Sequence, residues 1–226
     1  MEMRTNPGHR AGTKKIVIVD DHPILRKGLA MLINQEQDLV VAGEAGDARK
    51  AMELIESLSP DMVIIDISLP GVDGVELIKN IKLKYEDLPA LVVSMHDEAL
   101  FAERALRSGA RGYIMKQEAV EKVLTAIRRI LAGEIFVSSA IATKMLEKLV
   151  EGEPKSAASP LDLLSDREMS VFHLIGQGMS TRHIAEELHL SVKTIESYRA
   201  HIKEKLRLTS GMDLLKYALQ WVQKST

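Results

Sequence analysis

The stretch MVIIDISLPGVDG at residues 62–74 joins a short run of branched apolar residues to an aspartate, which is followed by a turn rich in Pro and Gly. A short apolar run without polar alternation is typical of a strand that is buried on both faces, as in parallel sheets. The stretch therefore predicts a buried strand that ends at Asp66 and carries an acidic group at its carboxyl end.

Similar runs recur on both sides of this stretch and alternate with amphipathic segments. The strand-like runs are KIVIVD at 15–20, VVAGE at 40–44, ALVVS at 90–94 and GYIM at 112–115. Helical patterns cover 23–33, 48–58, 75–83, 99–106 and 119–131. Alternating strands and helices with right-handed crossovers predict an α/β fold: a doubly wound, five-stranded parallel sheet of the flavodoxin-like kind.

Polar groups follow four of these strands: Asp20 and Asp21, Asp66, Ser94, and Lys116. The carboxyl ends of parallel strands meet at one edge of the sheet, so these groups are expected to share a pocket. Crowded carboxylates repel one another unless a cation is present, and Mg²⁺ prefers such oxygen ligands. The pocket fits attack by the Asp66 carboxylate on phosphorus, with the lysine offsetting phosphoryl charge.

The strand signal ends before the last third of the chain. Residues 139–150 predict one more helix, and EGEPKSAASP at 151–160 predicts a linker. Four short helices follow, opened by Ser165, Ser180, Ser191 and Ser210 as N-caps. Ser165 with Glu168 forms a capping-box pattern, and Gly176 and Gly178 are expected to end the first of these helices. The expected domains are a flexible tail at 1–14, an α/β domain at 15–133, a linker helix and linker at 134–160, and an all-α four-helix domain at 161–226.

Composition limits the compartment and the partners. The net charge is −2, with acidic excess in the middle of the chain and slight basic excess after residue 155. There is no cysteine, which excludes disulfides and thiolate metal sites. No apolar run has the length of a membrane helix and no secretory signal is visible. We expect a cytoplasmic protein that does not enter the membrane.

The third helix of the all-α domain, VKTIESYRAHIKEKL at 192–206, has one apolar and one polar face. Together with the preceding helix it predicts a helix-turn-helix unit that reads double-stranded DNA. The expected phosphate contacts are Lys193, Arg199 and Lys203, and the expected base readers are Thr194, Glu196 and Ser197. Further expected DNA contacts are Ala200, Thr181 and Arg182.

One such domain offers few DNA contacts, so a homodimer on paired half-sites is expected. The apolar residues of the last helix fit either the dimer interface or core packing. They are Leu214, Leu215, Ala218, Leu219 and Trp221.

The first domain resembles the receiver domain of two-component response regulators. The resemblance is carried by IVIVDDHPILRKGL, VIIDISLPGVDGVEL, VVSMH and GYIMK. It implies that Asp66 accepts a phosphoryl group from a sensor histidine kinase. It also implies that Asp20, Asp21, Asp66 and the backbone carbonyl of Ser68 hold Mg²⁺.

The same resemblance assigns further residues around the phosphoacceptor. Lys116 and Ser94 would hold the phosphoryl oxygens, and Ser94 with Tyr113 would form the conformational switch. Without the resemblance, Tyr113 fits a plain core aromatic equally well. Two histidines, His22 and His96, are expected to flank the pocket.

The all-α domain resembles the LuxR-type helix-turn-helix domain, through LLSDREMSVFHLIGQGMSTRHIAEELHLSVKTIESYRAHIKEKL. The whole chain thus resembles the NarL/FixJ subfamily of response regulators, which implies a phosphorylation-dependent transcription regulator and not an enzyme. The sequence departs from the family's usual pattern at Arg182 and His183, and at Gly211, where the family usually has Arg.

Two alternatives remain. One is a small α/β phosphatase that turns over an aspartyl phosphate, although the adjacent pair Asp20 and Asp21 differs from the spaced Asp-x-Asp of haloacid-dehalogenase-type enzymes and no Gly-rich phosphate loop is present. The other is a DNA-binding protein with a vestigial receiver, although the intact five-residue site disfavours it.

Overall fold

The computed structural model describes residues 12–150, 160–188 and 190–225. The chain divides into two compact units, Met1–Ser138 and Ser139–Thr226, which are treated separately below. Most of the expected tail and most of the expected linker, at 1–11 and 151–159, lie outside the described residues.

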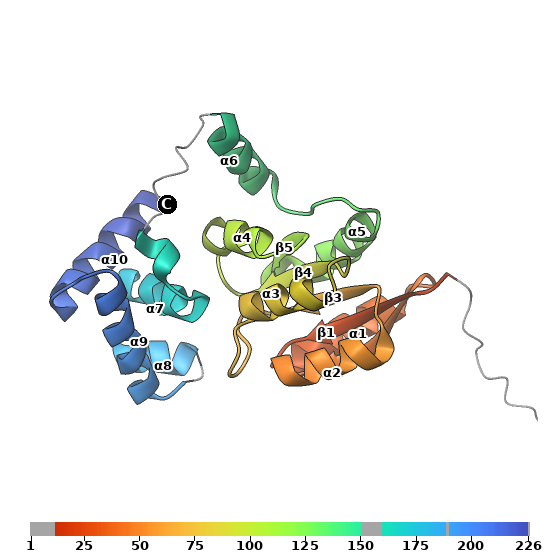
Figure 1. The fold of residues 1–226 in the computed structure, drawn as a ribbon, viewed down its shortest axis with the longest axis horizontal. Helices are drawn as coiled ribbons and strands as arrows, with labels where there is room; N and C mark the ends of the chain where they lie inside the picture. Colours follow the sequence, from red (N-terminus) through yellow and green to blue (C-terminus); the bar gives the residue numbers. More distant parts are fainter. Residues whose placement is uncertain (1–11, 151–159, 189, 226) are drawn as a thin grey trace, which may run out of the picture. The chain divides into compact units, whose positions relative to one another are not determined.

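The first unit is built on a five-stranded sheet in which every pairing is parallel. Its strand order is β2-β1-β3-β4-β5 (Figure 1). The strands are β1 (Lys14–Val19), β2 (Leu39–Ala45), β3 (Met62–Ile65), β4 (Ala90–Ser94) and β5 (Gly112–Met115). The predicted doubly wound sheet is confirmed, and β1 begins one residue before the expected domain boundary.

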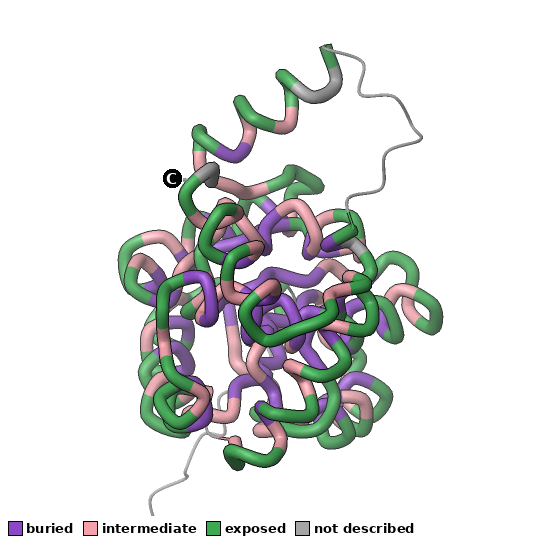
Figure 2. Tube along the Cα trace, turned by 90° about the vertical axis from the view of Figure 1, so that its left-hand side faces the viewer, coloured by how far each residue is buried: buried purple, intermediate pink, exposed green. Residues whose placement is uncertain are grey.

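Helices cover both faces of this sheet. They are α1 (Pro23–Asn34), α2 (Ala48–Leu58), α3 (Gly74–Lys84), α4 (Glu98–Arg107) and α5 (Ala119–Leu131). Apolar residues of α1 and α5 form one continuous core with alternate residues of the strands, while α3 contacts α2 and α4. All residues of β3 and β4 are buried, which explains why these runs are uniformly apolar in the sequence. Figure 2 shows buried residues in purple and exposed residues in green along the chain.

All secondary-structure elements in the described part of the second unit are helices. Its helices are α6 (Ser139–Val150), α7 (Asp166–Gly176), α8 (Thr181–Glu187), α9 (Val192–Lys205) and α10 (Gly211–Ser225). Phe172 of α7 lies at the centre, with its ring centroid 5.7 Å from that of Tyr217 and 5.6 Å from that of Trp221 on α10. Aromatic packing of this kind holds small helical domains together.

The structure corrects two details of the sequence prediction. Gly176 was expected to help end α7, but it belongs to the helix, where a Cβ atom would lie 2.5 Å from Val222 Cγ2. This glycine therefore permits the close crossing of α7 and α10, and Gly178, with a φ of 82°, follows the helix end. Two short 3₁₀ helices were not expected: η1 (Lys116–Glu118) and η2 (Pro160–Leu163).

No helix in the described ranges combines the length and the apolarity needed to span a lipid bilayer.

Candidate functional site

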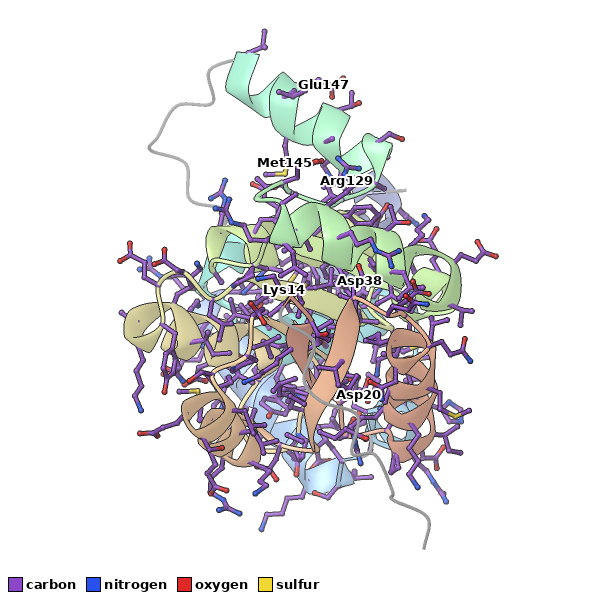
Figure 3. The ribbon with its side chains drawn as sticks, turned by 90° about the vertical axis from the view of Figure 1, so that its right-hand side faces the viewer. Lys14, Asp20, Asp38, Arg129, Met145 and Glu147 are labelled. Carbon is purple, nitrogen blue, oxygen red and sulfur yellow. The ribbon has the colours of Figure 1, made fainter. Side chains whose placement is uncertain are left out.

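The carboxyl ends of β1 and β3 bring acidic side chains to the same edge of the sheet. The last residues of these two strands pair with each other, and Asp20, Asp21 and Asp66 follow directly. Asp20 and Asp66 are each only 2% exposed. In Figure 3, Asp20 lies at the opposite end of β1 from Lys14. Two of the three predicted strand-end carboxylates are therefore buried, and Asp21 is half-buried.

Lys116 directly follows β5, which is an edge strand of the sheet. Its side chain extends from there to the carboxylates after β1 and β3. Its Nζ lies 2.7 Å from Asp66 Oδ2 and 2.8 Å from Asp20 Oδ2. Burial alone would favour the neutral amine, but the charges of Asp66 and Asp20 outweigh it and raise the pKa of Lys116. The site thus keeps an ammonium group in contact with two carboxylates.

Burial also raises the pKa of Asp20, and the nearby charge of Asp66 adds to this effect, while Lys116 opposes it. A third group, His22, approaches from the start of α1, with its Nδ1 2.7 Å from Asp21 Oδ1 and 3.2 Å from Asp20 Oδ1. Asp20, Asp21, His22 and Asp66 offer ligand atoms within 4.8 Å of one another. This is the group of described residues that could hold a metal ion.

The expected switch residues lie beside the cluster. Ser94 is fully buried at the end of β4, and Tyr113 on β5 is only 1% exposed. The Tyr113 hydroxyl donates to the backbone carbonyl of His96 at 2.8 Å. Burial raises the pKa of Tyr113. Ser94 Oγ accepts from the backbone amide of His96 at 3.3 Å. Both side chains therefore contact the backbone of His96.

A side-chain contact that the sequence did not predict joins two loops of this edge. Ser68 Oγ, two residues after Asp66, lies 2.9 Å from His96 Nε2. The imidazole of His96 also packs on Phe101, with ring centroids 4.6 Å apart. The expected histidine is thus placed near the pocket, but a contact between two side chains 28 residues apart leaves no local signal in the sequence.

Gly74 allows the start of α3 to approach the backbone of Asp66 closely. The amide of this glycine donates to Ile67 O at 2.9 Å, and a Cβ atom there would lie 2.1 Å from the backbone oxygen of Asp66. Asp73 caps α3 through Val75 N. Glycine is therefore required at this position by close approach of two backbone segments.

In the second unit, α9 presents the expected polar face to solvent. Ile195 and Ile202 are buried on its opposite face. Of the expected DNA contacts, those exposed are Arg182, Lys193, Glu196, Ser197 and Ala200, and those half-buried are Thr181, Thr194, Arg199 and Lys203. None of the residues expected to contact DNA from α9 therefore belongs to the buried face of this helix.

Some of these residues already have partners within the domain. The Thr194 hydroxyl lies 2.7 Å from Ser191 Oγ, which caps α9, and Arg182 pairs with Glu186 at 3.3 Å on α8. In α10, Leu214 and Ala218 are fully buried. These two residues therefore belong to the domain core in this structure.

A buried carboxylate anchors the last turn of α9. Glu168 accepts from Ser165 N at 2.7 Å in the expected capping box, and its Oε2 also lies 2.6 Å from Lys205 Nζ. The capping box was predicted from the sequence. Its link to Lys205 was not, because the two residues are 37 positions apart.

Comparison with known proteins agrees with both halves of this description. Residues 16–128 match the family model "Response regulator receiver domain", and residues 162–218 match "Bacterial regulatory proteins, luxR family". The chain belongs to the response regulators. The predicted family is thus confirmed, and this response regulator combines a receiver with a LuxR-type DNA-binding domain.

Relatives of this response regulator include the oxygen regulatory protein NreC of Staphylococcus epidermidis, which is 35% identical over 211 residues, or 91% of this chain and 97% of the relative. NreC of Staphylococcus carnosus is 34% identical over 210 residues, with the same coverage. The match therefore extends over nearly the whole length of these proteins.

Solved structures show the same relationship. A LuxR-family two-component response regulator from Aurantimonas sp. aligns with a TM-score of 0.57 and 37% identity, over 61% of this chain and 99% of that one. RcsB from Salmonella enterica serovar Typhimurium, bound to a promoter with the phosphomimetic BeF₃⁻, aligns with a TM-score of 0.57 and 28% identity. That alignment covers 91% of this chain and 98% of RcsB.

Proposed function

We propose that Asp66 accepts a phosphoryl group from a sensor histidine kinase, and that this modification changes dimerisation and DNA binding by the C-terminal domain. The observation that carries the proposal is the buried contact of Lys116 with both Asp66 and Asp20 at the end of the sheet. Such a cluster is costly unless it serves a reaction or a ligand. The chain then acts as a transcription regulator and not as a turnover enzyme.

The chemistry follows from the positions of these groups. A carboxylate oxygen of Asp66 forms a bond to phosphorus as the bond from phosphorus to the donor nitrogen breaks, and the nitrogen keeps the electron pair. Lys116 balances charge on the phosphoryl oxygens, and Ser94 hydrogen-bonds to one of them. Contact with the new phosphoryl group would draw Ser94 toward Asp66 and alter its contact with Tyr113.

The residues present fit Mg²⁺. Asp66 Oδ1 is buried and has no hydrogen-bond partner among the described residues, and the neighbouring carboxylates supply the oxygen ligands that this ion prefers. Asp20, Asp21, Asp66 and the carbonyl of Ser68 would hold it. When bound, the ion offsets negative charge on the transferring phosphoryl group.

The regulatory step requires a shift between two populations. Moving a resting state from 1:99 to 99:1 takes about 5.5 kcal/mol of differential stabilisation. Dimer formation on paired DNA half-sites supplies part of this energy. The RcsB relatives support the scheme, since their structures include two dimers bound to DNA, at 29% identity to this chain and a TM-score of 0.56.

The test uses the full chain with Mg²⁺ and acetyl phosphate, followed by intact mass measurement. Wild type is expected to gain one phosphoryl group and Asp66→Asn none, because the amide cannot act as the nucleophile. Asp61→Asn is the matched control, since Asp61 lies at the other end of the sheet and bonds to Lys14 and to the backbone of Lys15. This control should gain mass as wild type does.

Two results would contradict the proposal. A gain in Asp66→Asn equal to that of wild type would place the reaction at another residue. Equal DNA affinity of wild type with and without BeF₃⁻, in fluorescence anisotropy, would remove the link between phosphorylation and DNA binding. Steady release of phosphate from an added ester would instead support the phosphatase alternative.

A further inference from the structure

The turn that ends α9 contains an arginine in a backbone conformation that favours glycine. Arg207 has a φ of 55°. Its amide donates to Glu204 O at 3.1 Å, and the next amide, of Leu208, donates to Lys203 O at 2.8 Å. Helices commonly end in this way on glycine, because an L side chain is strained in the left-handed region. Glycine would therefore fit this position better than arginine.

Among the described residues, one other non-glycine position has a positive φ. It is Ser59, with a φ of 45°, at the end of α2. Serine is short, whereas Arg207 carries a long cationic side chain and is exposed. A residue whose backbone is held in a strained conformation is a reason to look for a function of its side chain.

The position of Arg207 just past the end of α9 indicates such a function. At 3.6 residues per turn, Lys193, Ala200 and Lys203 lie on the side of α9 away from the buried Ile202. A rise of 1.5 Å per residue separates Lys193 from Lys205, the last residue of α9, by about 18 Å, and Arg207 follows two residues later. The major groove is about 12 Å wide, so a helix whose first turns lie in the groove carries its far end to the flanking backbone.

The charge of Arg207 is available for a partner outside the domain. No carboxylate in the described part of the chain forms an ion pair with it. Two other cations of the same unit do form ion pairs: Lys205 pairs with Glu168, and Arg182 pairs with Glu186. A guanidinium group offers several donors in a geometry that matches phosphate.

We infer that Arg207 binds a phosphate of the DNA backbone just outside the major groove that α9 enters. The contact would pair an exposed cation that has no ion pair within the described residues, and it accounts for an arginine at a strained position. The inference rests on the proposed function, since it names a contact that this domain makes with DNA.

The test compares Arg207→Gly with wild type in two measurements on the full chain. Relief of strain should raise the melting temperature of the variant by about 2–4 °C. Loss of the phosphate contact should weaken binding by about tenfold and reduce the slope of log affinity against log salt by about 0.9 per bound chain. The probe is a fluorescein-labelled duplex selected from a random pool by BeF₃⁻-activated wild type.

Ser59→Gly is the matched control, because it relieves the same kind of backbone strain in the first unit. It should raise the melting temperature without any change in DNA affinity or salt slope. Arg207→Asn removes the charge while tolerating the left-handed region, so it should bind DNA as weakly as Arg207→Gly.

The outcomes separate this inference from the function on which it rests. If wild type bound no duplex in any state, the proposed function would fail and this inference with it. If wild type bound and Arg207→Gly matched its affinity and salt slope, only the inference would be overturned.

Discussion

Asp20, Asp66 and Lys116 are buried and contact one another at the end of the sheet in the first unit. The cations of α9 that are expected to contact DNA are instead exposed or half-buried along one helix: Lys193, Arg199 and Lys203. Removing a buried partner leaves an uncompensated charge in a medium of low polarity, which is costly. Removing one exposed cation costs little in stability, and its effect on binding is one contribution among several. The stability of the pocket therefore depends on each of its charged groups, whereas DNA binding by α9 depends on the combined contribution of its cations.

The largest expected effect on stability comes from Lys116→Met, which tests the importance of burial in this comparison. This change leaves Asp20 and Asp66 together without their ammonium partner, so unfolding in urea should show a loss of about 3 kcal/mol. Added Mg²⁺ should recover part of the loss, because a bound cation replaces the missing charge. Lys122→Met is the control: Lys122 forms an exposed pair with Glu118, and its removal should cost less than about 0.5 kcal/mol. Equal losses in the free energy of unfolding for the two variants would contradict the expectation that a buried ion pair matters more than an exposed one.

Gly74→Ala tests the backbone around the same pocket. The added Cβ would meet Asp66 O at 2.1 Å, so the loop must shift, at a cost of about 2 kcal/mol. Phosphorylation by acetyl phosphate should also slow, because Asp66, the proposed phosphoacceptor, moves with the loop. Gly28→Ala in α1 meets no atom within 4 Å and should stabilise the protein by about 0.5–1 kcal/mol. Thermal unfolding and intact mass would check both variants, and a neutral Gly74→Ala would contradict the expectation.

The smallest effects are expected on α9, where two lysines sharpen the comparison. Lys203→Ala should weaken DNA binding about threefold to tenfold and leave stability unchanged, since a single phosphate contact is lost. Lys205→Ala should lower stability by about 1 kcal/mol, because the buried Glu168 loses its partner. Anisotropy and urea unfolding together would separate the two roles. Identical behaviour of the variants would show that burial of the partner does not matter here.

Much of the fold could be predicted because local patterns and global packing agree. The uniformly apolar runs around Met62–Ile65 and Ala90–Ser94 belong to strands that are buried on both faces, and the serine caps of α7, α8 and α9 are present in the structure. The closeness of Asp20, Asp66 and Lys116 followed from the rule that parallel strands end at one edge. These features depend on backbone topology, which the sequence pattern encodes.

The remaining features depend on side-chain rotamers and on packing between distant segments. The contact of Ser68 with His96 and the reach of His22 to Asp21 depend on how each side chain turns at its loop. Gly176 was misread because a glycine near a helix end usually stops the helix, and only the crossing of α10 shows that it is needed inside. The left-handed backbone of Arg207 likewise has no signature in its residue type.

Glu168 joins the start of one helix of the second unit to the end of another. It holds the backbone of Ser165, where the chain enters α7, and through Lys205 it also holds the final turn of α9. The start of α7 and the last turn of α9, the helix proposed to contact DNA, are therefore both bonded to one carboxylate. A displacement of Ser165 at the start of α7 therefore acts on the same carboxylate that pairs with Lys205, and this links the entry of the chain into the helical domain to the end of α9.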